Sequence, residues 1–191
     1  MRAPVVIDIE TKKTFREASN PKDLGISVVG LYDYATGKLR AYVEKEFGEL
    51  FSVLEHASML IGFNLDSFDL PVLQAYYPGD VTQFKTFDIL SDVRRILGRR
   101  VSLDELVKTT LGEGKSGHGL QAITFYRKGM WDELKKYCLD DVRLTKELFD
   151  YGIKEKKIYY NSPGGKRFMT VSWESFAADE GKNDVNLTLP F

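Results

Sequence analysis

The sequence predicts an α/β fold, a mixed β-sheet that joins an antiparallel meander to parallel strands and is flanked by helices. Two observations predict it. β-Rich segments separated by turn signals come first, which is typical of an antiparallel meander. Short apolar strands then alternate with amphipathic helices, which is typical of parallel strands covered on both faces. The 191 residues, 43% of them hydrophobic, are enough for one domain with its own core.

The predicted meander has three strands. The first, Val5 to Thr11, is a β-branched run that ends in two carboxylates. A polar stretch containing the turn signal Asn20-Pro21 leads to a second β-rich segment at 25–34. Residues 35–38, Ala-Thr-Gly-Lys, have the composition of a hairpin turn, and the chain returns as a strand at 39–43.

The alternating part starts at residue 47. Apolar residues at helical spacing, with glycine, proline or capping residues at the ends, predict helices at 47–56, 67–76, 88–97, 102–112, 120–128 and 131–156. Short buried strands are predicted between them, at 58–63 and 84–87. Ser102 and Glu105 have the spacing of a capping box. Pro71 falls in the first turn of its helix, where a missing N–H is tolerated.

The end of the chain is predicted to form a hairpin and a tail. Strands at 158–160 and 168–171 flank the turn sequence Asn-Ser-Pro-Gly-Gly. We expect Tyr159 and Tyr160 to pack within this hairpin rather than stack on bases. Helical and strand periodicity fade from residue 174. The expected organisation is therefore one domain at 1–160, the end of the hairpin at 161–173 and a flexible tail at 174–191.

Charge, cysteine content and hydropathy exclude several protein classes. The net charge of −1 provides no global field toward nucleic acid or membranes, so nucleic-acid binding would depend on local basic patches. Cys138 is the single cysteine, so no disulfide forms within the chain, which fits a reducing cytosol. The start of the sequence does not resemble a signal peptide, and no apolar run approaches the ~20 residues of a membrane helix. We therefore expect a cytoplasmic protein without a membrane partner.

Two carboxylates at the end of the first strand are the first candidate site residues. Because side chains alternate along a strand, Asp8 and Glu10 point to the same side and Ile9 to the other. These like charges repel each other, and either water or a cation must offset the repulsion. A solvated strand end is the alternative. In a mixed sheet, ligands gather at the carboxyl ends of strands, where this pair lies.

Spacing selects the partners of this pair from 28 acidic residues. Asp69 falls in the first turn of a helix after a buried strand, so it is either a ligand or an ordinary acid at a helix N-terminus. Asp66 competes in that stretch and is the better N-cap candidate. Tyr137 and Asp141 are four residues apart on an inward face of the longest helix, where a carboxylate needs a partner. For Tyr137 the alternative is an ordinary core tyrosine.

In order and in element type, these residues resemble the three motifs of the DEDD superfamily of 3′–5′ exonucleases, here Asp8-x-Glu10, Asn64-x-x-x-Phe68-Asp69 and Tyr137-x-x-x-Asp141. The tyrosine resembles the DEDDy branch. The other branch has a histidine five residues before the last aspartate, where this chain has Lys136. Residues 4–160 resemble the proofreading domain of family-B DNA polymerases and related stand-alone predicted exonucleases. The resemblance implies a ribonuclease-H-like fold, with an exonuclease domain at 1–160.

The resemblance also implies a catalytic site with two Mg²⁺ or Mn²⁺ ions. Phosphodiester hydrolysis needs an activated water and a stabilised leaving oxygen, and two hard cations held by carboxylates supply both. By the resemblance, Asp8 bridges the ions, and Glu10 and Asp141 complete the water-activating site. Asp69 supports the other ion.

Tyr137 completes the catalytic set implied by the resemblance. A phenol with a pKa near 10 is a poor base at neutral pH, so we expect Tyr137 to orient the attacking water. Asn64 and the backbone of Thr11 are the expected substrate-binding groups.

The expected activity is a metal-dependent 3′–5′ exonuclease on single-stranded nucleic acid, with DNA as the first choice. A ribonuclease acting on RNA or short oligoribonucleotides is one alternative, and a non-catalytic nucleic-acid-binding module is another. The arginines at 94, 95, 99 and 100 either contact phosphates or form a solvated face.

The last six residues, Asn186 to Phe191, resemble the short peptide with which bacterial replication proteins bind the sliding clamp. The family pattern starts with glutamine, whereas this chain has asparagine. A sliding clamp is therefore a candidate partner. The alternative is that this peptide folds back on its own domain.

Overall fold

A computed structural model describes residues 2–114 and 120–174. Within these ranges, five strands form a mixed sheet in the order β3-β2-β1-β4-β5. Their bounds are β1 Val5–Thr11, β2 Ile26–Asp33, β3 Lys38–Tyr42, β4 Leu60–Gly62 and β5 Thr86–Asp88. Strand β2 pairs antiparallel with β1 and β3, whereas β4 runs parallel to β1 and β5. The predicted α/β fold, a meander joined to parallel strands, is confirmed.

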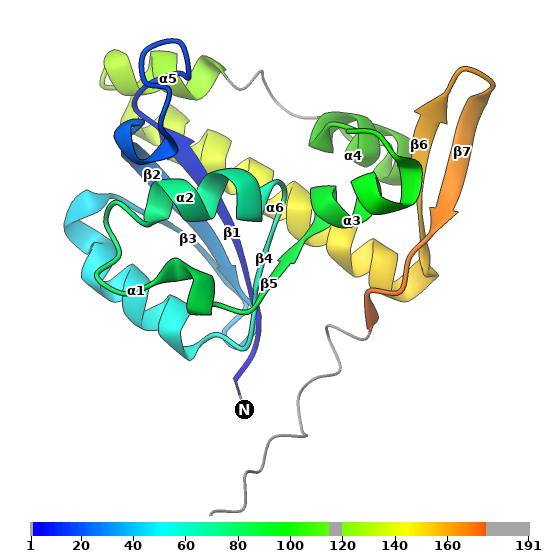
Figure 1. Cartoon of the computed structure of the whole chain (residues 1–191), viewed down its shortest axis with the longest axis horizontal. Coiled ribbons are helices and arrows are strands. Elements are labelled where there is room, and N and C mark those ends of the chain that lie inside the picture. The colour runs from blue at the N-terminus through cyan, green and yellow to red at the C-terminus, as the bar shows by residue number, and fades with distance from the viewer. Residues whose placement is uncertain (1, 115–119, 175–191) are drawn as a thin grey trace, which may run out of the picture.

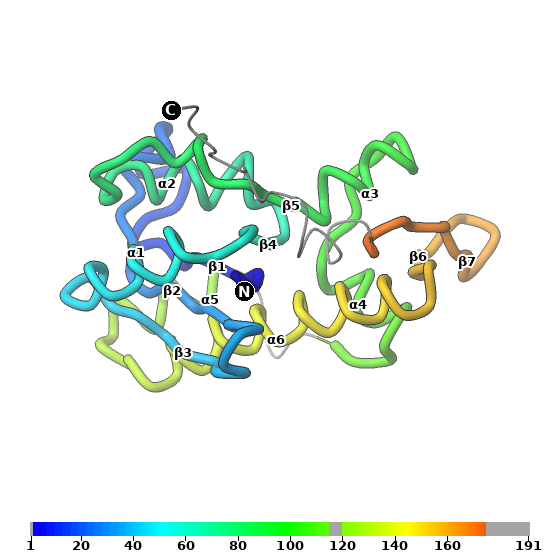
Figure 2. Tube along the Cα trace, turned by 90° about the horizontal axis from the view of Figure 1, so that it is seen from below, coloured from blue at the N-terminus to red at the C-terminus, as the bar shows by residue number. Residues whose placement is uncertain are grey.

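Helices cover both faces of this sheet (Figures 1 and 2). The α-helices are α1 Phe47–His56, α2 Leu70–Leu73, α3 Ile89–Leu97, α4 Leu103–Leu111, α5 Leu120–Arg127 and α6 Trp131–Glu155. Alternate residues of β1 pack on opposite sides, as the period of a strand requires. Ile7 shares one core cluster with Leu50 of α1, and Val6 shares another with Val142 of α6.

A glycine lets α6 approach the sheet closely. Gly30 of β2 lies opposite Asp8 of β1. A Cβ atom at Gly30 would lie 2.8 Å from Val142 Cγ2 and 2.9 Å from Cys138 Sγ, closer than real Cβ atoms come to such neighbours. Any larger residue would therefore push α6 away from the strand that carries Asp8 and Glu10.

The expected helix at 67–76 is wrong in its bounds and its geometry. A π-helical turn, Leu65–Asp69, comes first, and the short helix α2 follows it with Pro71 at its start, as predicted. Asn64 precedes the turn in the left-handed conformation, with φ of 68°, so Asp66 is not the N-cap. The cause is a distant strand, because Asp88 of β5 accepts hydrogen bonds from the backbone N–H groups of Asn64 and Asp66.

Helix ends elsewhere follow the predicted signals. Ser102 accepts a hydrogen bond from the backbone N–H of Glu105, at 3.1 Å, as the first half of a capping box. The carboxylate of Glu105 instead accepts from the backbone N–H of Asn161, at 3.0 Å. Gly98 and Gly112 end α3 and α4 in the left-handed conformation that glycine adopts without strain.

A second, two-stranded sheet follows α6 in the described part of the chain. It consists of β6, Lys157–Ser162, and β7, Gly165–Thr170, so its turn is shorter than the expected Asn161–Gly165. Residues 175–191, including the clamp-like peptide at 186–191, lie outside the described residues. Among the described residues, no helix is long and apolar enough to cross a membrane.

Candidate functional site

Three of the predicted site residues come together at the carboxyl end of β1. One carboxylate oxygen each from Asp8, Glu10 and Asp141 lies within 4.8 Å of the other two. Asp8 and Glu10 are half-buried and project from β1 on the side that faces α6, and Asp141 is buried on α6. Residues more than 130 positions apart in sequence thus form one acidic cluster.

Local structure places the first two carboxylates. Asp8 lies opposite Gly30, a position that α6 approaches closely. The pairing register of β1 and β2 shifts between Glu10 and Thr11, which marks a β-bulge or similar irregularity at the end of the strand. The hydroxyl of Ser27 donates to the backbone carbonyl of Glu10, at 3.0 Å, and secures this end.

Asp69 lies behind the acidic cluster rather than within it. Its side chain is only 3% exposed, and its Oδ1 accepts a hydrogen bond from the backbone N–H of Ile9, at 2.9 Å. Burial, and next the neighbouring charge of Asp8, raise the pKa of the Asp69 carboxyl well above its usual range. A cation at the cluster would reverse this balance, because it stabilises the ionised form.

Tyr137 places a polar atom beside the cluster. The side chain is 5% exposed, and its hydroxyl has no hydrogen-bond partner among the described residues. Burial, followed by the charge of Asp141 one helical turn away, raises the pKa of the phenol above its usual value. The hydroxyl therefore stays protonated at neutral pH and can donate to, or accept from, a water or an oxygen of a ligand.

Cys138 is a further member of the site that the sequence patterns did not identify as such. Its buried Sγ lies 3.6 Å from the carbonyl oxygen of Asp8 and 3.7 Å from Asp8 Oδ2. Burial, and then the charge of Asp8, raise the pKa of the thiol well above its usual value. The neutral thiol is thus a weak hydrogen-bond donor that supports the orientation of Asp8.

Asp88 is a second residue that sequence reasoning missed. Its buried Oδ1 accepts from the backbone N–H groups of Asn64, at 2.8 Å, and Leu90, at 2.9 Å, and its Oδ2 accepts from the hydroxyl of Ser91, at 3.1 Å. One carboxylate therefore caps α3 and holds the turn that carries Asp69. Its position just before a helix was a sequence signal for an N-cap, but only the parallel pairing of β4 with β5 brings it to Asn64.

A pocket of about 390 Å³ opens beside the cluster and is lined by Asp8, Phe63, Asn64, Leu90, Arg100, Val101, Ser102 and Leu103. The guanidinium of Arg100 donates to Asn64 Oδ1, at 3.3 Å, so one arginine of the predicted basic cluster reaches this pocket. Thr11 is buried, and its hydroxyl donates to the carbonyl of Lys13, at 2.8 Å. Its side chain is thus used in holding the loop after β1.

The donor set fits a hard divalent cation. The cluster offers carboxylate oxygens, which are the ligands that Mg²⁺ and Mn²⁺ prefer, and three close carboxylates repel one another unless a cation offsets their charge. The buried Tyr137 hydroxyl, which has no partner among residues 2–114 and 120–174, adds a place for an ordered water or a ligand oxygen. The geometry is therefore suited to activating water at a phosphate ester.

Comparison with known proteins agrees with the ribonuclease-H-like fold. A family model for the RNase H superfamily matches residues 5–153. Among solved structures, a family B DNA polymerase from the hyperthermophilic archaeon Pyrobaculum calidifontis has a TM-score of 0.57 at 15% identity, over 78% of this chain and 24% of the polymerase. RNase D from Trypanosoma brucei has a TM-score of 0.57 at 20% identity, over 78% of this chain and 57% of that protein. No curated protein matches the chain in sequence.

Proposed function

The chain belongs to the RNase H superfamily, and we propose that it is a metal-dependent 3′–5′ exonuclease that acts on single-stranded nucleic acid. The observation that carries the proposal is the acidic cluster of Asp8, Glu10 and Asp141. Beside it lies the hydroxyl of Tyr137, which has no hydrogen-bond partner among the described residues. The two similar structures are a DNA polymerase and an RNase D, and both are similar in fold alone.

In this proposal the acidic residues hold the metal. Asp8, Glu10 and Asp141 are the ligands. Asp69 supports the site from behind by accepting a hydrogen bond from the backbone N–H of Ile9, which lies between Asp8 and Glu10. When bound, divalent cations supply an activated water and stabilise charge on the phosphate and leaving oxygens. The protein contributes fixed oxygen donors on a strand and a helix, both of which are rigid elements.

The remaining residues orient the reactants. The raised pKa of Tyr137 keeps its hydroxyl protonated, so it positions water or a phosphate oxygen rather than acting as a base. Asn64 and Arg100 line the pocket next to Asp8, where the arginine would meet a phosphate and the amide would meet a sugar or base edge. Thr11 remains a proposed backbone contact at the end of β1.

The sequence also suggested a non-catalytic binding module as an alternative function and a sliding clamp as a partner. A non-catalytic nucleic-acid-binding module would not require three carboxylates at this spacing, so the enzyme is the better supported function. The sliding clamp stays a predicted partner, because the peptide at 186–191 lies outside the described residues.

Hydrolysis of single-stranded DNA and RNA of the same sequence, each with Mg²⁺ or Mn²⁺, tests the proposal and decides between the two substrates. We expect wild type to degrade at least one of them and the Asp141→Ala variant to lose that activity. A substrate preference identifies the polymer, because only RNA carries the 2′-hydroxyl. Equal product formation by wild type and Asp141→Ala would overturn the proposal.

A further inference from the structure

The hairpin of β6 and β7 projects from the end of α6, away from the five-stranded sheet (Figures 1 and 2). Side chains of paired residues in an antiparallel hairpin share a face, and that face recurs every second residue. Ile158 and Met169 form one pair and are buried against the body of the protein. The opposite face, which we call the outer hairpin face, is formed by Lys157, Tyr159, Asn161, Lys166, Phe168 and Thr170.

Aromatic rings and lysines alternate on the outer hairpin face. Phe168 is 61% exposed and lies opposite Tyr159, with ring centroids 6.4 Å apart. The ammonium of Lys166 lies 4.4 Å from the Tyr159 ring centroid, and that of Lys157 lies 6.0 Å from the Phe168 centroid. Tyr159 thus packs within the hairpin, as expected. It also forms part of an aromatic, cationic surface, so, unlike the expectation from the sequence, we include it among the rings that can stack on bases.

The charge of the hairpin has one sign. Residues 156–170 include four basic side chains and no acidic one. Of the neighbouring carboxylates, Glu174 lies 3.7 Å from Lys156 and offsets one of these four charges, whereas Glu105 lies 3.8 Å from Arg99, outside the hairpin. Although the whole chain carries a net charge of −1, this surface is locally positive and is complementary to a polyanion.

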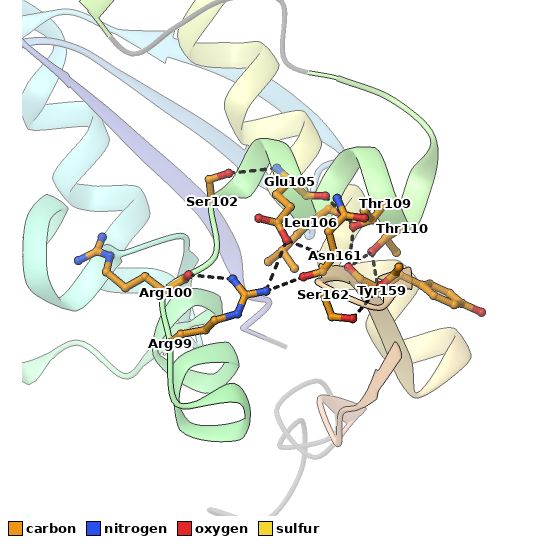
Figure 3. A network of polar contacts seen from close by, with 11 residues as sticks. Arg99, Arg100, Ser102, Glu105, Leu106, Thr109, Thr110, Tyr159, Asn161 and Ser162 are labelled. Atoms are coloured by element: carbon orange, nitrogen blue, oxygen red, sulfur yellow. Dashed lines mark hydrogen bonds and ion pairs between the residues drawn. The ribbon is translucent and has the colours of Figure 1, made fainter. Parts of the chain in front are cut away.

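Polar contacts fix the hairpin to the body, so the outer hairpin face is a rigid platform (Figure 3). The carbonyl of Tyr159 accepts from the hydroxyl of Thr109, at 2.7 Å, and its N–H donates to the hydroxyl of Thr110, at 2.9 Å. Two residues further along β6, the carbonyl of Asn161 accepts a hydrogen bond from the guanidinium of Arg99, at 2.6 Å. A rigid platform loses little conformational entropy when it binds a ligand.

We propose that the outer hairpin face binds single-stranded nucleic acid, with bases stacking on Phe168 and Tyr159 and phosphates meeting Lys157 and Lys166. Exposed aromatic rings beside cationic side chains are how proteins bind single strands without reading sequence. Asp141 and the start of the hairpin are separated by about 20 Å of helix α6, at ~1.5 Å per residue, so this surface is distinct from the catalytic cluster. The strand is the substrate of the proposed exonuclease, and in that respect the inference rests on the proposed function.

Binding is measured by fluorescence anisotropy with a labelled oligothymidylate of about thirty nucleotides, in chelator so that no cleavage occurs. We expect Phe168→Ala to weaken binding by about tenfold, the range seen when one stacking aromatic is removed. Because Phe168 is mostly exposed, this variant should melt like wild type. Leu39→Ala is the matched control, an apolar residue 40% exposed on β3 at the other edge of the molecule.

Salt dependence tests the lysines independently of stacking. The double variant Lys157→Gln/Lys166→Gln removes both positive charges. It should reduce the slope of the logarithm of the binding constant against the logarithm of the salt concentration by about 1.4, at ~0.7 per lost phosphate contact on a single strand. Lys38→Gln, on β3, should leave the slope unchanged. An oligouridylate of equal length is the RNA arm and should respond in the same way, because stacking and phosphate contacts do not require a particular sugar.

Hydrolysis of a trinucleotide separates this inference from the proposed function. We expect a trinucleotide bound at the catalytic cluster not to reach the hairpin, which starts about 20 Å along α6 from Asp141. Phe168→Ala should therefore hydrolyse it with wild-type kcat and KM and should show a raised KM on the long strand. If wild type hydrolyses the trinucleotide but the hairpin variants bind long strands as tightly as their controls do, the inference is wrong and the exonuclease proposal stands. If wild type hydrolyses neither substrate, the proposed function fails.

Discussion

The backbone N–H of Ile9 donates a hydrogen bond to Oδ1 of Asp69, at 2.9 Å and across 60 positions of sequence. Ile9 is the residue between Asp8 and Glu10, so the bond ties the second acidic motif to the middle of the first. It also keeps the buried carboxyl group of Asp69 beside Asp8. This hydrogen bond therefore links Asp69 directly to the strand that carries Asp8 and Glu10.

The ionisation of Asp69 should make the metal-free protein sensitive to pH. Because burial raises the pKa of this carboxyl, its protonated form is favoured by folding. The protonated Asp69 therefore contributes to the free energy of unfolding in full below the ordinary aspartate pKa of about 4. This contribution is lost as the pH rises through the raised pKa of the folded protein. In chelator, the melting temperature of wild type should therefore fall more steeply from about pH 4 to about pH 8 than that of Asp69→Asn, which stays neutral. Parallel curves for the two proteins would contradict this reading of Asp69.

Metal binding should stabilise the folded protein. Free Mg²⁺ at 100 times its Kd is expected to add about 2.7 kcal/mol, or roughly 5–10 °C in melting temperature for a chain of this size. Asp8→Ala should lose most of that gain, because the cluster then has one ligand fewer. Glu155→Ala, an exposed carboxylate on the same helix as Asp141, is the control and should keep it. A wild-type melting curve that saturating metal leaves unchanged would count against a metal site here.

Removing the hydroxyl of Tyr137 should impair catalysis without loss of stability. Tyr137→Phe is expected to lower kcat by about tenfold to hundredfold, the cost of a poorly positioned reactant. Stability should be equal or slightly higher, since a buried hydroxyl without a partner among the described residues is deleted. The raised pKa of the phenol predicts that the pH profile of the variant keeps the wild-type shape through the neutral range. If wild-type activity rose with pH through that range and Tyr137→Phe lost this rise, Tyr137 would instead be identified as a general base.

Asp88 is predicted to matter for both stability and activity. Asp88→Ala leaves the buried N–H of Leu90 and the part-buried N–H of Asn64 without this acceptor and should cost about 2–3 kcal/mol in the free energy of unfolding. At temperatures well below the melting transition, kcat should also fall, because the turn that presents Asp69 is released. Asp80→Ala is the control, since this exposed aspartate caps a short helix far from the site and should cost about 1 kcal/mol or less. Wild-type kcat in folded Asp88→Ala would show that Asp88 has only a structural role.

Local patterns were sufficient for most of the fold. The β-branched run at Val5 to Thr11, the helical spacing from residue 131 and the glycines after α3 and α4 each act within a few residues, and each was placed correctly from the sequence. The order of the acidic motifs also pointed to Asp8, Glu10 and Asp141 among the 28 acidic residues, and the structure brings their carboxylates together.

Contacts between distant segments account for what the sequence did not predict. The π-helical turn before Asp69 depends on a carboxylate from β5, and the role of Gly30 depends on a helix more than 100 positions later. The outer hairpin face likewise depends on which side of β6 packs against the body, because period-two patterns do not say which face is covered. Such pairings are decided by tertiary structure rather than by neighbours in sequence.

The direction in which a single strand labelled at one end is degraded tests the assigned activity. With Mg²⁺, a 5′-labelled strand should shorten progressively as a ladder, whereas a 3′-labelled strand should release labelled mononucleotide from the start. Asp141→Asn, which keeps the shape of the side chain but removes its charge, should give neither pattern. Internal fragments without a ladder, release from the 5′ end, or a ladder that Asp141→Asn forms at the wild-type rate would contradict the assignment of a metal-dependent 3′–5′ exonuclease to the cluster of Asp8, Glu10 and Asp141.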